Sequence, residues 1–114
     1  MTNYKEERPW GVFENLLEES YCKVKKITIK PNQRPSYQYH FKRNEHWVIV
    51  SGKAVVTIDG VDKVYEAGDS VFVPALSRHR VENRGETDLV FIEVQTGSYF
   101  GEDDIVRVED DYER

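Results

Sequence analysis

Short apolar or alternating segments, separated by turn residues, recur about every ten residues along the chain, and this spacing constrains the fold most. The predicted strands are Lys23–Lys30, Ser36–Phe41, His46–Val50, Ala54–Ile58, Lys63–Tyr65, Ser70–Val73, Arg80–Glu82 and Leu89–Gln95. Asp59-Gly60 predicts a two-residue hairpin, because a type I′ turn needs a positive φ at both central residues. Such strands, without intervening helices, indicate an all-β sandwich or barrel. Only Phe13–Glu19 and the tail after Glu102 are candidates for short helices.

Chain length and charge distribution indicate one domain with a distinct tail. A length of 114 residues falls within the ~100–150 residues of a typical single domain. We expect residues 1–114 to form this domain, with an N-terminal arm at 1–20 and an acidic C-terminal tail at 98–114. The net charge is +4 over residues 1–57 and −9 over residues 58–114. The acidic tail is most simply a solvated surface.

Charge and hydropathy argue against several classes of function. The chain has no dense basic stripe of the kind that neutralises nucleic-acid phosphates. No apolar run approaches the ~20 residues that a membrane span needs. The single cysteine, Cys22, cannot form an internal disulfide, which fits the reducing cytoplasm. We therefore expect a cytoplasmic protein that binds neither nucleic acid nor membrane, although Lys42-Arg43 could attract a small anion.

Four metal-capable side chains stand out from the predicted strands. Alternation along Ser36–Phe41 places Gln38 and His40 on one face, so that both can converge on the same point. Glu45 follows across the next turn, and His79 lies at the start of a distant strand. A single histidine at a strand start is more often a hydrogen-bonded structural residue than a ligand. Taken alone, each of these residues is therefore weak evidence for a metal site.

The spacing of these residues resembles the two motifs of the cupins, G-x5-H-x-H-x3,4-E-x6-G and G-x5-P-x-G-x2-H-x3-N. The first corresponds to Asn32-x5-Gln38-x-His40-x4-Glu45-x6-Gly52, and the second to Gly68-x5-Pro74-x-Leu76-x2-His79-x3-Asn83. The resemblance implies a double-stranded β-helix, the jelly-roll barrel of cupins. Asn32 and Leu76 replace glycines. Asn tolerates a positive φ, whereas Leu76 suggests a slightly different turn before His79.

The cupin resemblance implies one divalent metal held by Gln38, His40, Glu45 and His79. Gln38 stands where the motif has a histidine, but its amide still offers a carbonyl oxygen. Two imidazoles, a carboxylate and an amide oxygen suit Zn²⁺ best and also accept Mn²⁺, Fe²⁺, Co²⁺ or Ni²⁺. The set resembles that of the zinc-dependent phosphomannose isomerases. A metal-free remnant of the site is the alternative.

Longer strings resemble the C-terminal domain of type II mannose-6-phosphate isomerases, from about Arg8 to Arg114. They are Arg8-Pro9-Trp10-Gly11, Gln38-x-His40-x-x-Arg43-x-Glu45-His46-Trp47 and the segment from Ile92 to Arg107. The resemblance implies a phosphorylated sugar as substrate and interconversion of mannose 6-phosphate and fructose 6-phosphate through an enediol. That domain usually follows a mannose-1-phosphate guanylyltransferase domain, whose activity we do not expect here. Phe41 and Lys42 replace histidines frequent in the family.

The resemblance also implies roles beside the metal. Arg43 and Lys42 are the nearest candidates to neutralise the phosphate or the enediolate, with Arg107 as a third. His46 and Glu93 are the candidates for the catalytic base. His46 could instead pack beside Trp47, and Arg107 could form a structural ion pair within its acidic surroundings.

Other functions and a quaternary structure remain open from the sequence. A non-catalytic cupin that binds a sugar or a partner needs only the pocket, and a metal-dependent oxygenase is less favoured because oxygenase cupins usually keep three or four histidines. A homodimer is predicted from an apolar surface formed by the face of Tyr37, Tyr39 and Phe41 together with Trp10 and Phe13. This surface is larger than one small barrel can easily bury. These rings could instead fill the space between the sheets.

Overall fold

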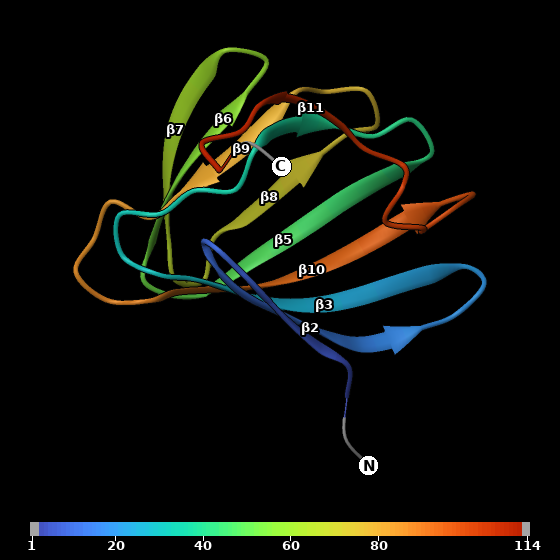
Figure 1. Ribbon diagram of the computed structural model, residues 1–114, viewed down its shortest axis with the longest axis horizontal. Coiled ribbons are helices and arrows are strands. Elements are labelled where there is room, and N and C mark those ends of the chain that lie inside the picture. The colour runs from blue at the N-terminus through green and yellow to red at the C-terminus, as the bar shows by residue number, and fades with distance from the viewer. Residues whose placement is uncertain (1–2, 113–114) are drawn as a thin grey trace.

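A computed structural model describes residues 3–112, and all regular elements in this range are strands. The larger antiparallel sheet contains, in order, β1 (Lys5–Arg8), β2 (Gly11–Glu18), β3 (Cys22–Ile29), β10 (Leu89–Gly97), β5 (Arg43–Ser51) and β8 (Ser70–Val73). The smaller contains β11 (Val106–Glu109), β4 (Tyr37–Tyr39), β9 (His79–Glu82), β6 (Lys53–Ile58) and β7 (Val61–Glu66). The two sheets face each other across a shared interior (Figure 1). The all-β prediction is therefore confirmed.

Neither predicted helix is present among residues 3–112. Phe13–Glu19 lies almost entirely in β2, which pairs with β1 on one side and β3 on the other. A register shift between Asn15 and Leu17 interrupts the strand alternation, and this bulge explains why the sequence there resembles a helical pattern. The tail after Glu102 makes a turn and then forms β11 against β4. No helix in the described range is long and apolar enough to cross a membrane.

Positive φ angles mark three informative turns. Asp59 and Gly60 have φ angles of 47° and 83°, as the predicted type I′ hairpin between β6 and β7 requires. Asn32 and Leu76, which replace motif glycines, have φ angles of 62° and 72°. Leu76 thus retains a left-handed backbone despite its side chain, at a cost of order 1–3 kcal/mol. Its amide donates to the carbonyl of His40 (2.8 Å), which ties this turn to a predicted ligand.

The core fills one part of the interior with large apolar side chains. It contains Trp10, Phe13, Ile29, Trp47, Ile49, Ala54, Val56, Val71, Val73, Val81, Leu89 and Phe91. Trp10 and Phe13 are therefore buried within one chain, which corrects the view of them as surface for a second copy. Phe41 is 56% exposed, and Tyr37 and Tyr39 are half-buried. The homodimer stays a prediction.

Candidate metal centre

Three of the four predicted ligands form one buried cluster. His40, directly after β4, Glu45 on β5 and His79 at the start of β9 place one ligand atom each within 4.8 Å of one another. The side chains are 2% exposed in each case. β4 and β9 belong to the small sheet and β5 to the large one, so the cluster bridges the two sheets. The motif spacing therefore identified residues that the fold brings together.

The hydrogen bonds of the two histidines prepare both rings to bind a cation. Nδ1 of His40 lies 2.6 Å from the carbonyl of Asp104, and Nδ1 of His79 lies 3.0 Å from the carbonyl of Ser77. Because a carbonyl only accepts, each Nδ1 carries the proton and each Nε2 has a lone pair, which in His40 accepts from Arg43 Nη2 (3.2 Å). Nε2 of His79 is buried and has no hydrogen-bond partner. Such a histidine, anchored through its other nitrogen, is the usual arrangement at metal sites.

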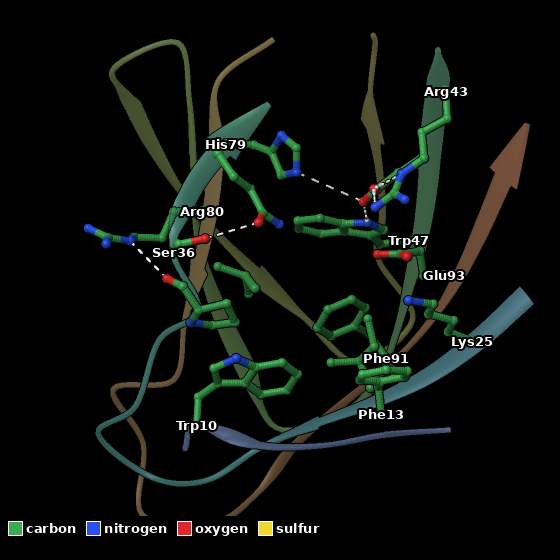
Figure 2. Close-up of a pocket in the computed structure, with 15 residues that line it drawn as sticks. Trp10, Phe13, Lys25, Ser36, Arg43, Trp47, His79, Arg80, Phe91 and Glu93 are labelled. Carbon is green, nitrogen blue, oxygen red and sulfur yellow. Dashed lines mark hydrogen bonds and ion pairs between the residues drawn. The ribbon is translucent and has the colours of Figure 1, made fainter. Parts of the chain in front are cut away.

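The carboxylate of Glu45 completes the donor set. Its oxygens lie 3.2 Å from Nε2 of His40 and 3.9 Å from Nε2 of His79. Two nitrogen lone pairs and one carboxylate fit a divalent transition metal, because they match its preference for imidazole and oxygen ligands. In Figure 2 the His79 ring and the Arg43 guanidinium extend toward this position from opposite walls. The residues therefore fit the metal implied by the sequence.

Arg43 and Trp47 hold the Glu45 carboxylate in place. Arg43 Nε donates to Oε2 (2.9 Å), and Trp47 Nε1 donates to Oε1 (3.0 Å). Burial alone would raise the pKa of Glu45, but the polar contact with His40 and the charge of Arg43 lower that pKa well below its usual range. Burial also lowers the pKa of His79. An ionised carboxylate and a neutral imidazole are the protonation states that a metal requires.

Gln38 lies at the edge of this cluster. Its position on β4 pairs with His79 on β9, and its half-buried side chain lines the pocket. Its Oε1 accepts a hydrogen bond from the Ser36 hydroxyl (3.0 Å). A second lone pair on this oxygen remains for another interaction. The fourth-ligand role of Gln38 stays a prediction.

A pocket opens beside the cluster and combines apolar walls with charged groups. Its aromatic walls are Trp10, Phe13, Trp47 and Phe91, and its ionisable groups include Lys25, Arg43, Arg80, Glu45 and Glu93 (Figure 2). Aromatic surfaces exclude water, while a few fixed polar groups orient a ligand. The pocket is therefore suited to a small polar ligand that carries negative charge.

Glu93 is the predicted base that the structure places in this pocket. It lies on β10, between Lys25 on β3 and Trp47 on β5, and is 5% exposed. Its Oε2 accepts a hydrogen bond from Gln95 Nε2 (2.7 Å). Burial, then the negative charge of Glu45, raises the pKa of Glu93 to about 8. Its side chain is therefore available as a proton carrier next to the cluster.

Three other predicted site residues lie outside the pocket, which corrects their proposed placement. His46 follows Glu45 on β5, so strand alternation directs it to the outer face, where its exposed ring packs on Phe72 (4.6 Å between centroids). Lys42 is exposed and its ammonium lies 5.3 Å from the Tyr99 ring centre. Arg107 is exposed on β11. We drop His46 as the candidate base.

The sequence analysis missed Lys25, which lines the pocket, and its neighbour Lys23. Both are buried on the inner face of β3. The sequence did contain a signal for this burial. Lys23 and Lys25 lie on the same face of the strand as the apolar Ile27 and Ile29 in the period-two alternation. The position of each side chain in the alternation, rather than its chemistry, would have predicted the burial.

Asp104 was also missed, although it organises the segment that carries His40. Its carboxylate accepts hydrogen bonds from the backbone amides of Phe41 (3.0 Å) and Lys42 (2.9 Å), and its carbonyl anchors His40. Burial alone would raise the pKa of Asp104, but these two amides lower it. No local sequence pattern predicts contacts between residues more than 60 positions apart.

Comparisons with known proteins agree with this architecture. Residues 1–110 match the family described as mannose-6-phosphate isomerase C-terminal. The chain is 45% identical over 107 residues to a mannose-1-phosphate guanylyltransferase of Salmonella montevideo and 47% identical over 107 residues to the alginate biosynthesis protein AlgA of Pseudomonas aeruginosa. Each alignment covers 94% of this chain but only 23% and 22% of the relatives, so the chain spans less than a quarter of their length.

A solved structure shows the same fold. The crystal structure of an RmlC-like cupin from Shewanella frigidimarina aligns with a TM-score of 0.75 at 25% identity and covers 89% of this chain and 87% of its own. Together with the two facing antiparallel sheets, this similarity confirms the predicted double-stranded β-helix. The chain has the cupin fold and belongs to the mannose-6-phosphate isomerase C-terminal family.

Proposed function

We propose that the domain is a metal-dependent isomerase that interconverts mannose 6-phosphate and fructose 6-phosphate. The observation that carries the proposal is the buried, unpartnered Nε2 of His79, which faces Glu45 and His40 beside a pocket that also holds Glu93 and Arg43. The family description and the mannose-phosphate names of the relatives support the choice of substrate.

Zn²⁺ is the metal that we propose, and Mn²⁺, Fe²⁺, Co²⁺ and Ni²⁺ also suit the donors. His40, Glu45 and His79 would hold it, with Gln38 as a fourth ligand. When bound, a divalent metal supplies an electrophile for the two sugar oxygens at C1 and C2.

The remaining chemistry falls to side chains in the pocket. In its ionised form Glu93 would take the proton from C2 of the open-chain aldose and return it to C1, while the hydroxyl proton moves from O2 to O1, so that the carbonyl moves from C1 to C2 with no net loss of atoms or electrons. The Arg43 guanidinium lies next to Glu45 and would stabilise the negative charge of the enediolate. Trp47 and Phe91, which are 2% and 1% exposed, would keep bulk water from this intermediate.

A coupled assay for fructose 6-phosphate formed from mannose 6-phosphate tests the proposal. We expect turnover with one equivalent of Zn²⁺ per chain, loss of turnover in chelator and recovery when metal returns. His79→Ala should reduce kcat/KM at least ~10²-fold and weaken zinc binding, because it removes a preorganised ligand. His46→Ala is the matched control, because this histidine lies on the outer face of β5, and it should retain the parent rate.

The two outcomes separate the isomerase from the non-catalytic alternative. A chain that binds one equivalent of metal and binds sugar phosphate, yet forms no fructose 6-phosphate with any of the five metals, would be a binding cupin. Equal rates in His79→Ala and the parent would contradict the role of the metal cluster.

A further inference from the structure

Two buried lysines lie side by side at one edge of the pocket. Lys23 and Lys25 are on the inner face of β3 and are 7% and 5% exposed. Burying an ammonium is costly unless an anion accompanies it. Lys23 Nζ lies 3.1 Å from Oε1 of Glu102, and Lys25 Nζ contacts the same oxygen. One carboxylate oxygen is therefore shared by two buried cations.

The lysine pair adjoins the groups assigned to catalysis. Lys25 lies opposite Glu93 in the register of β3 and β10, and Lys23 lies opposite Gln95. Lys25 Nζ is 4.2 Å from the ring centre of Phe13, which forms a pocket wall. Figure 2 shows the Lys25 side chain rising from β3 toward Glu93. An anion on these ammoniums would thus sit next to a ligand in the pocket.

The other two cationic side chains of the pocket, Arg43 and Arg80, are held by hydrogen bonds and ion pairs within the protein. Arg43 is bonded to Glu45. Arg80 donates to the carbonyls of Pro35 (3.1 Å) and Glu109 (3.2 Å), and its guanidinium also faces the carboxylates of Glu109 (3.6 Å) and Asp111 (3.8 Å). Each guanidinium is thus fixed in its orientation by several protein partners. Lys25 differs, because its carboxylate partner comes from a loop.

The Glu102 carboxylate has the properties of a group that another anion could displace from the two lysines. Glu102 lies in the segment between β10 and β11, and 47% of its side chain is exposed. Burial would raise its pKa, but the charges of Lys25 and Lys23 lower it to about 2, so this position favours an anion. The second anionic neighbour of Lys23, Glu18, lies 3.4 Å away with 61% of its side chain exposed and contributes little. Glu102 is thus the principal anion at this position.

We propose that Lys23 and Lys25 bind the phosphate group of the sugar substrate and that the Glu102 carboxylate occupies this anion site until phosphate displaces it. The inference rests on the proposed function, because it takes a phosphorylated sugar as the ligand. A phosphate monoester carries about −1.5 to −2 charges at neutral pH and has three acceptor oxygens, so it satisfies two ammoniums better than one carboxylate does. The phosphate role thus moves to Lys23 and Lys25 from the exposed Lys42 and Arg107.

Calorimetric titration of the whole chain with inorganic phosphate, mannose 6-phosphate and mannose tests the site. Glu102→Gln should tighten binding of both phosphate compounds about tenfold, because the competing charge is gone, and leave mannose unchanged. Lys25→Met should weaken both phosphate compounds at least about tenfold, and Lys23→Met should act in the same direction. Lys42→Met is the control, since this exposed lysine lies outside the pocket, and should match the parent.

The results distinguish failure of the proposed anion site from failure of the proposed isomerase activity. Phosphate binding that responds to Glu102 and Lys25 in a chain without turnover would support the anion site and reject the isomerase. Turnover with the same KM for mannose 6-phosphate in Lys25→Met as in the parent would reject the anion site and leave the isomerase. Should Lys25→Met fail to fold by circular dichroism, Glu102→Gln decides alone: unchanged phosphate affinity there overturns the proposal.

Discussion

The inner face of β10 runs through two different regions of the interior. Leu89 and Phe91, in its first half, lie beside Ile29 and other apolar side chains of the core. Glu93 and Gln95, in its second half, lie in the same alternation but are opposite lysines on β3 and opposite Trp47 and Glu45 on β5. All four side chains are at most 5% exposed. Period-two alternation thus predicts burial equally for both regions, and the chemistry of the side chains separates core from site.

The two regions also differ in how burial affects stability. An apolar side chain gains about 25 cal/mol for each Å² removed from water and needs no specific partner. A buried charge stabilises only when it is paired, and the charged region contains Glu45, Glu93, Lys23, Lys25 and Arg43. Nε2 of His79 and Oε1 of Gln95 are unpartnered there. We therefore expect the apolar region to contribute most of the free energy of unfolding. The charged region should contribute less to stability and serve function.

Phe91→Ala should have the largest effect on stability. Phe91 is 1% exposed and its ring centroid lies 5.0 Å from that of Trp47. Its truncation should lower the free energy of unfolding in urea by about 3–5 kcal/mol. Phe72→Ala, at a ring that is 51% exposed on the outer face, should change it by less than about 0.5 kcal/mol. Equal losses in the two variants would mean that the apolar region is not the principal source of stability.

Asp104→Ala should have an intermediate effect and act on the charged region. It removes the carboxylate that accepts the amides of Phe41 and Lys42, at a cost of about 1.5–3 kcal/mol in unfolding free energy. Because the two carboxylate bonds also fix the position of the Asp104 backbone carbonyl that anchors His40, zinc affinity should also fall about 10–100-fold in a competition titration. Asp103→Ala is the control, since its carboxylate accepts a hydrogen bond from the exposed Tyr99 hydroxyl and lies beside the same segment. If Asp104→Ala bound zinc as tightly as the parent, the Asp104 segment would have no role in supporting the metal site.

The sequence predicted the parts of this molecule that depend on local periodicity and motif spacing. The Asp59-Gly60 hairpin follows from turn chemistry, and the convergence of His40, Glu45 and His79 follows from the spacing of the two cupin motifs. β2 was missed because a bulge at Leu16 breaks its alternation.

The remaining errors arose where a residue was judged by the chemistry of its side chain rather than by its position in the alternation of a strand. His46 was a candidate base because it is the only histidine outside the predicted ligand set, yet it directly follows Glu45, and adjacent residues on a strand face opposite sides. Lys23 and Lys25 were not singled out as site residues, because lysine is rarely buried, yet a carboxylate 77 or more positions away makes their burial possible. Such tertiary partners are not visible in a single sequence.

Glu102→Gln should have the smallest effect, and it shows in the pH dependence of stability. The pKa of Glu102 is about 2 in the folded chain, below the ordinary value of 4.5. A carboxyl whose pKa is depressed by folding contributes stability above pH 4.5 and loses that contribution as the pH falls toward 2. The side chain is 47% exposed, so solvent screening limits this contribution to about 1 kcal/mol or less.

The pH profile isolates Glu102 from the other acids of the chain. Between pH 4.5 and pH 2.5 the parent should lose more unfolding free energy than Glu102→Gln, because only the parent must protonate a carboxylate paired with two buried lysines. Glu86→Gln, in the exposed loop between β9 and β10, should follow the parent curve. Were the Glu102→Gln curve parallel to that of the parent, the carboxylate would contribute no stability, and Lys23 and Lys25 would then be held without it.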